Sequence, residues 1–323
     1  MNAETLQHVD EMLLGKLAQP EGTLGEPFWP LKERISNLNV AFQDIWEDIQ
    51  DQDSGFFLPT VQIPLLAGTT EYALPASHSF LRRVWKKIAG GSTEDRMELA
   101  RLSLDEVGRR SGFAVEATDE FSDAAGPPEV TGITPLHRII VNPGIASTGY
   151  VLEVLFGKAP YWLTWGEVPA AAGLGNDDQI VLAGHEPKIR DCLVGSRLYL
   201  SEGMGAGAAR EVTAFDPNAA TGTATLASDW PGTPAPVTPD ATSVYTSLVP
   251  LPPRAIKVML FEAAMLCLAN EQAPQMAEMK MLRDEARIKM EYSIAQLNRH
   301  APPRVRDTAG YLDWSDGSYS TDG

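Results

Sequence analysis

The fold of this chain is constrained most by one stretch, Ile63-Pro64-Leu65-Leu66-Ala67-Gly68-Thr69-Thr70-Glu71-Tyr72-Ala73-Leu74-Pro75. Two short apolar runs are separated by Ala67-Gly68-Thr69-Thr70, and such a connection is typical of a tight β-hairpin. Pro75 has no backbone N–H to donate to a ladder, so the second strand is expected to end there. A third strand is predicted from Phe80 to Ile88. The sequence thus predicts that the two runs of this stretch form a hairpin.

Amphipathic helices are expected at both ends of the chain. Apolar residues recur every three or four positions from Leu31 to Gln52, which predicts a long helix with one buried stripe. A shorter helix is predicted within residues 1–18, an apolar helix between Pro253 and Pro274, and a last helix from Met276 to Asn298. Because neither end of the chain can bury its apolar stripe alone, these helices are expected to pack together.

The central part of the chain has the period of two that is typical of strands. Further strands of a first β-rich region are predicted at Arg138–Asn142 and Tyr150–Gly157. Five short strands with turn signals between them predict a second module, a small barrel or sandwich. These five strands are Gln179–Leu182, Ser196–Leu200, Arg210–Phe215, Thr221–Ala227 and Ser243–Val249.

The predicted fold class is α+β. It consists of a helical bundle formed by the N- and C-terminal helices, with inserted β-sandwich or barrel modules and an extended C-terminal tail. The predicted divisions are N-terminal bundle helices (1–55), a first β-rich region (56–173), an inserted small β module (174–250), C-terminal bundle helices (251–300) and a tail (301–323).

Composition restricts the functions that this chain can have. The net charge is −17, and no segment has the large Lys/Arg surplus that sequence-independent DNA binding requires. No apolar run approaches the roughly 20 residues of a membrane span, and the first twenty residues lack the pattern of a signal peptide, so a cytosolic origin without a membrane partner is expected. Cys192 and Cys267 are too few and too far apart for a disulfide framework or a Cys-rich metal site.

The order of these motifs resembles a known family. A helix followed by an apolar run, Ala-Gly-Thr-Thr-Glu-Tyr-Ala-Leu-Pro and then Phe-Leu-Arg-Arg-Val is similar to the head-to-tail adaptor (connector) proteins of tailed bacteriophages. That family includes tail tubular protein A and the packaged-DNA-stabilising tail accessory proteins. The resemblance covers the first predicted hairpin and the overall layout. It implies a ring, a dodecamer to match the portal, that docks under the portal protein.

Several residues could carry chemistry, but structural roles account for their patterns. The glycines of 203–207 lie between two predicted strands, whereas a dinucleotide site needs a helix after them, so a hairpin turn is expected. The five histidines have no metal-ligand spacing; they are His8, His78, His137, His185 and His300. Ser196, His185 and Asp191 could be imagined as a triad, but no nucleophile elbow accompanies them. No catalytic residue, cofactor or metal is therefore expected.

Two features could contact partners. Arg82-Arg83 and Lys86-Lys87 alternate with apolar residues, either as a DNA- or partner-facing stripe or, as we favour, as the charged outer face of a half-buried sheet paired with acidic segments. The C-terminal tail carries the residues that we expect to bind a partner, against the alternative of a frayed terminus. These residues are Tyr311, Leu312, Trp314 and Tyr319.

The resulting hypothesis is a structural virion protein of the phage neck, assembled in the host cytoplasm. Its expected partners are the portal protein, downstream tail or nozzle proteins, and other copies of itself in a ring, while genomic DNA passes through the channel without specific binding. The alternative is a tail-fibre or baseplate-type protein whose β module binds a glycan or another tail protein. An enzyme is the third and weakest hypothesis.

Overall fold

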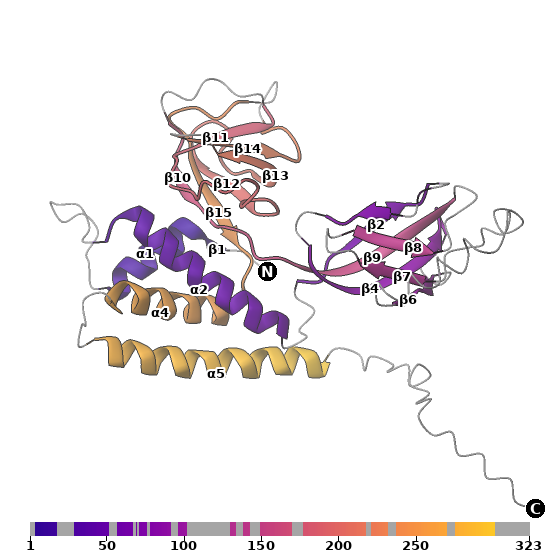
Figure 1. Ribbon diagram of the computed structural model, residues 1–323. Coiled ribbons are helices and arrows are strands. Elements are labelled where there is room, and N and C mark those ends of the chain that lie inside the picture. Colours follow the sequence, from indigo (N-terminus) through magenta and orange to yellow (C-terminus); the bar gives the residue numbers. More distant parts are fainter. Residues whose placement is uncertain are drawn as a thin grey trace, which may run out of the picture.

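A computed structural model describes residues 4–17, 29–51, 57–66, 69, 71–75, 78–91, 96–101, 130–133, 138–142, 149–169, 177–217, 221–231, 237–269 and 275–300. The fold is mixed α+β, as predicted, with four helices in the described part of the chain. These helices gather on one side of two β units (Figure 1). They are α1 (Leu6–Lys16), α2 (Leu31–Asp51), α4 (Pro253–Ala269) and α5 (Met276–His300).

The first β unit consists of two sheets whose described pairs are antiparallel except for the pair β6–β7. One sheet has the order β2 (Thr60–Pro64), β9 (Tyr150–Lys158), β4 (His78–Ile88) and β5 (Met97–Glu98). The other has the order β3 (Glu71–Ala73), β8 (Arg138–Asn142), β7 (Val130–Ile133) and β6 (Ala100–Arg101). Buried residues from both sheets, including Tyr72, Val84 and Val154, form one core.

The hairpin predicted between Ile63 and Pro75 is wrong. β2 pairs with β9 and β3 pairs with β8, so the two strands lie in different sheets. The intervening turn is held by the Tyr72 hydroxyl, which donates to the carbonyl oxygen of Thr69 at 2.9 Å and accepts from the backbone N–H of Leu66 at 3.0 Å. A turn that is fixed by a side chain does not require its flanking strands to pair with each other, and the chain passes here from one sheet to the next.

The second β unit contains all five strands that the sequence predicts. They are β11 (Gln179–Leu182), β12 (Arg197–Glu202), β13 (Ala209–Pro217), β14 (Gly222–Leu226) and β15 (Val244–Val249). Two further strands pair with β15 and were not predicted: β1 (Glu4–Thr5) opposite Leu248–Val249, and β10 (Trp165–Glu167) opposite Val244–Thr246. The strands by which this unit is entered and left, β10 and β15, are therefore neighbours.

The helices from the two ends of the chain share one core. The predicted stripe of α2 is buried from Ile35 to Ile49, and α4 is buried around much of its circumference. Trp46 of α2 stacks on Phe57, with ring centroids 3.5 Å apart, and Phe42 packs beside it. Cys267 lies in this core and Cys192 is half-buried beside that of the second β unit, both as free thiols.

A buried ion pair joins α1 to α2. The guanidinium group of Arg34 donates to both carboxylate oxygens of Asp10 at 2.8 and 2.7 Å, and a third N–H donates to the carbonyl oxygen of Trp29 at 2.6 Å. The exposed fractions of the two residues are 1% for Asp10 and 5% for Arg34. The two-point contact fixes the orientation of α1 against α2.

Candidate interaction surface and buried polar network

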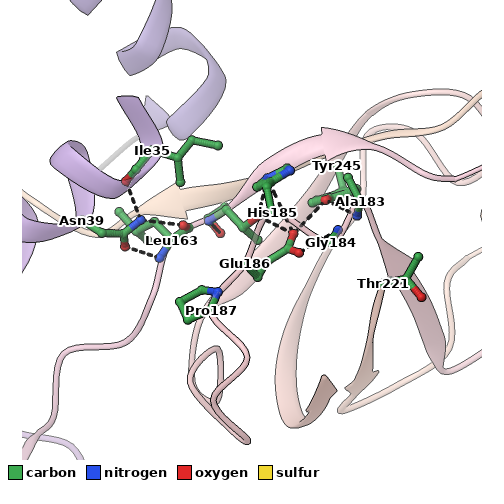
Figure 2. Close-up of polar contacts among 12 residues, drawn as sticks. Ile35, Asn39, Leu163, Ala183, Gly184, His185, Glu186, Pro187, Thr221 and Tyr245 are labelled. Atoms are coloured by element: carbon green, nitrogen blue, oxygen red, sulfur yellow. Dashed lines mark hydrogen bonds and ion pairs between the residues drawn. The ribbon is translucent and has the colours of Figure 1, made fainter. Parts of the chain in front are cut away.

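The densest group of polar side chains surrounds Glu186, just after β11. One carboxylate oxygen of Glu186 accepts hydrogen bonds from the hydroxyls of Thr164 at 2.8 Å and Tyr245 at 2.9 Å, and the other accepts from the backbone N–H of Gly184 at 3.0 Å. His185 lies at the edge of the group, with its Nε2 atom 3.2 Å from the Thr164 hydroxyl. Figure 2 shows His185, Glu186 and Tyr245 converging on one point.

This network is sealed from solvent. Glu186 is 3% exposed, and Thr164 and Tyr245 are fully buried. Burial, reinforced by the neighbouring Glu186 carboxylate, raises the pKa of Tyr245 well above its ordinary value, so the phenol stays protonated and donates. A carboxylate with three donors is satisfied and has no access to a substrate. The network joins the turn after β11 to β15 and to the residue before β10.

A second polar joint connects the helices to the second β unit. The side chain of Asn39, on α2, donates to the carbonyl oxygen of Leu163 at 2.8 Å and accepts from its backbone N–H at 2.6 Å (Figure 2). It also donates to the carbonyl oxygen of Ile35 within its own helix. The two-sided contact with Leu163 has the geometry of a strand pair, so Asn39 holds the linker before β10 at a fixed place on α2.

The residues of the imagined triad do not form one. The described partners of His185 are Thr164 and Glu186, whereas Asp191 accepts from the backbone N–H of Phe215 at 2.9 Å. Ser196 is fully buried, and its hydroxyl has no hydrogen-bond partner among the described residues. The three side chains serve different contacts, with no bond between Ser196 and either of the others.

The glycine-rich segment 203–207 is a hairpin connection, as predicted. It joins β12 to β13, which pair antiparallel, and no helix follows it. Gly203, Gly205 and Gly207 all have positive φ angles, between 80° and 88°. At Gly203 an added Cβ would lie 2.5 Å from the backbone of Ser243, so this position requires glycine for the close approach as well.

Several other sequence candidates can be placed. Among the described residues, no three His, Cys, Asp or Glu side chains gather as metal ligands, and no helix is long and apolar enough to cross a bilayer. In the basic stripe on β4, Arg83 lies 3.6 Å from Glu98 on β5, but Lys86 is buried and does not lie on the charged outer face that the sequence predicts. His137 and the four tail residues lie outside the described part of the chain. The four tail residues are Tyr311, Leu312, Trp314 and Tyr319.

A groove of about 820 Å³ lies between α1, α4 and α5. Its floor is apolar and includes Met12, Phe261 and Leu282. Its rim carries four basic residues against the single acid Glu285. These basic residues are Lys16, Arg254, Lys257 and Lys289. Sequence reasoning missed this site, because residues more than 200 positions apart meet only once the helices pack.

An apolar stripe on α5 adjoins the groove. Met281, Ile288 and Tyr292 have exposed fractions of 75%, 66% and 59%, although they are large and apolar. Their spacing of seven and four residues places them in one row, and Met279, Met290 and Ile294, which are buried, lie on the opposite side of the helix. In Figure 1, α5 is the outermost helix, with α4 between it and α2. This exposed apolar row is a candidate surface for protein contact.

Comparison with known proteins identified no family: no family model matches the chain, and no curated protein matches it.

Proposed function

We propose that this chain is a structural subunit of a phage neck, a head-to-tail adaptor that docks under the portal as a ring and surrounds the DNA channel. In this proposal the helices form a split bundle, and the second β unit is an inserted barrel or sandwich. The observation that carries the proposal is the exposed stripe of Met281, Ile288 and Tyr292 on α5, the outermost helix. It supports a protein that works by contact with other protein chains.

The buried polar network supports the same conclusion. Glu186 is the most promising acid–base group in the described part of the chain, yet its carboxylate is occupied by three donors and closed to solvent. A general acid or base must reach a substrate proton at hydrogen-bond distance. The polar side chains of this unit therefore support a role in holding the β unit in place.

A ring requires two different surfaces on each copy, one of which meets the other on the next copy. We assign the α5 stripe to one side of this contact. The dodecamer is implied by the resemblance to the adaptor family. The acidic overall charge of −17 suits a channel through which DNA passes without being retained.

Electron microscopy of the purified protein, alone and mixed with portal rings, tests the proposal. Rings that cap the portal are expected for the natural sequence. Ile288→Glu should abolish them, because a carboxylate would have to be buried in the contact. The matched control is Ile189→Glu, at an equally exposed isoleucine of the second β unit, 64% against 66%.

Two results would overturn the adaptor proposal. Trimers that bind glycan or a tail protein through the second β unit would favour the fibre or baseplate alternative. A protein that stays monomeric with portal rings present would exclude both ring assembly and portal docking.

A further inference from the structure

The groove between α1, α4 and α5 is a basic site in an acidic protein. Lys16, Arg254 and Lys257 are exposed at its rim, and none of them forms an ion pair with a carboxylate in the described part of the chain. The fourth cation, Lys289, is paired with Glu285, and this hydrogen bond lowers the pKa of the Glu285 carboxyl. Among the described residues, these three positive charges at the apolar groove therefore have no carboxylate partner.

A simple anion would satisfy the basic rim of the groove but would leave its apolar floor uncovered. Lys16 lies over the ring of Phe261, 5.5 Å from its centroid, and Leu282 and Met12 line the same hollow. Burying apolar surface here would add to the attraction of the rim charges. The groove thus fits a chain segment that carries both aromatic and acidic side chains.

One segment of this chain has that composition. Residues 311–323, Tyr-Leu-Asp-Trp-Ser-Asp-Gly-Ser-Tyr-Ser-Thr-Asp-Gly, contain three aromatic residues, three aspartates and no lysine or arginine. Two of the three aspartates, Asp313 and Asp316, lie within two residues of Trp314. We propose that residues 311–319 dock in the α1–α4–α5 groove of the same chain, with Trp314 in the apolar floor and Asp313 and Asp316 at the basic rim.

The chain is long enough for this contact. Ala286, in the groove, lies 14 residues before His300, which is about 21 Å along a helix that rises 1.5 Å per residue. The ten residues 301–310 span up to about 33 to 36 Å when extended. A tether of this length keeps the segment at an effective concentration on the order of millimolar, so that a weak contact is enough to fill the groove. The inference holds whether or not the chain assembles into a ring.

Zero-length carbodiimide cross-linking of the full chain, followed by peptide mass spectrometry, tests the contact. The expected products link Asp313 or Asp316 to Lys16, Lys257 or Lys289. Lys16→Glu/Lys257→Glu should reduce the remaining links to Lys289 at least threefold, and Lys188→Glu, an exposed lysine of the second β unit, should leave them unchanged. Salt at 0.5 M should weaken them as well, because it screens exposed charges.

A variant outside the helices keeps the test independent of folding. Trp314→Ala should reduce the same links at least threefold without changing the thermal melting of the helices. Links that survive Trp314→Ala, or that go to lysines outside the groove in equal yield, would overturn the proposal. Mixing ¹⁵N-labelled and unlabelled chains separates the two arrangements: links within one chain support the proposal, and links between labelled and unlabelled chains overturn it in favour of docking on a second copy.

Discussion

Removal of one partner from the buried pair of Asp10 and Arg34 should destabilise the helical core strongly. Arg34→Met leaves the Asp10 carboxylate 1% exposed with no cation beside it, and loss of one partner of a buried pair costs about 3 to 5 kcal/mol of the free energy of unfolding. The double variant Asp10→Leu/Arg34→Met removes both charges. It should cost only about 1 to 2 kcal/mol, chiefly because the carbonyl oxygen of Trp29 loses its donor.

Urea unfolding followed by helical circular dichroism measures these differences. The exposed pair of Arg83 and Glu98 is the control, since its side chains are 52% and 49% exposed, and Arg83→Met should cost less than about 1 kcal/mol. If Arg34→Met costs no more than Arg83→Met, or if the double variant is less stable than Arg34→Met, the pair does not hold α1 against α2.

Three further predictions concern the core, the polar network and the thiols. Phe42→Ala should lower the free energy of unfolding by about 3 to 5 kcal/mol through lost burial and a cavity, and Glu47→Gln, on the exposed face of α2, should change it little; thermal melts in the reverse order would contradict the assignment of the faces. Because the pKa of Tyr245 is raised in the folded state, its stabilisation is complete below about pH 10 and is lost as the pH rises toward the folded pKa, by up to about 1.4 kcal/mol per pH unit. In urea titrations between pH 9 and 11, Tyr245→Phe should reduce the decline of the free energy of unfolding with pH. An unchanged slope would show that ionisation of Tyr245 does not cause this decline. Burial raises the pKa of Cys192 to about 12, so at pH 8 a thiol reagent should label it at least about a hundredfold more slowly than a free thiol until urea unfolds the chain, and fast labelling of the folded protein would contradict this.

The elements that the sequence predicts best are those with a strong local period. The stripe of α2 from Ile35 to Ile49 and the five strands of the second β unit lie within about two residues of their predicted ranges, because burial on one face imposes a repeat that is visible in the residues themselves. β1 and β10 have only two and three residues. Such short strands form because β15 has an edge with which they can pair. They are too short to show a repeat of apolar residues in the sequence.

Pairing between distant segments is harder to predict. The turn before Tyr72 was located correctly, but the partners of its strands, β9 and β8, lie about 70 to 90 residues further along the chain. The basic groove is an extreme case, since Lys16 and Lys257 belong to helices at opposite ends of the sequence. The Asp10–Arg34 pair likewise depends on how α1 packs on α2, and neither residue stands out in its own helix.

The adjacency of β10 and β15 has a consequence for the order in which the chain folds. About 200 residues separate the end of α2 from the start of α4. The entropic cost of bringing these two helices together falls when segments within this long loop fold first and shorten it. The hairpin contacts of β12, β13 and β14 are local and form without waiting for the helices. Once β10 pairs with β15, with Trp165 opposite Thr246, the 80 residues between these two positions no longer count toward that loop. The second β unit therefore shortens the search by which the first and last helices meet, and substitutions at the β10–β15 register should slow refolding of the helical core.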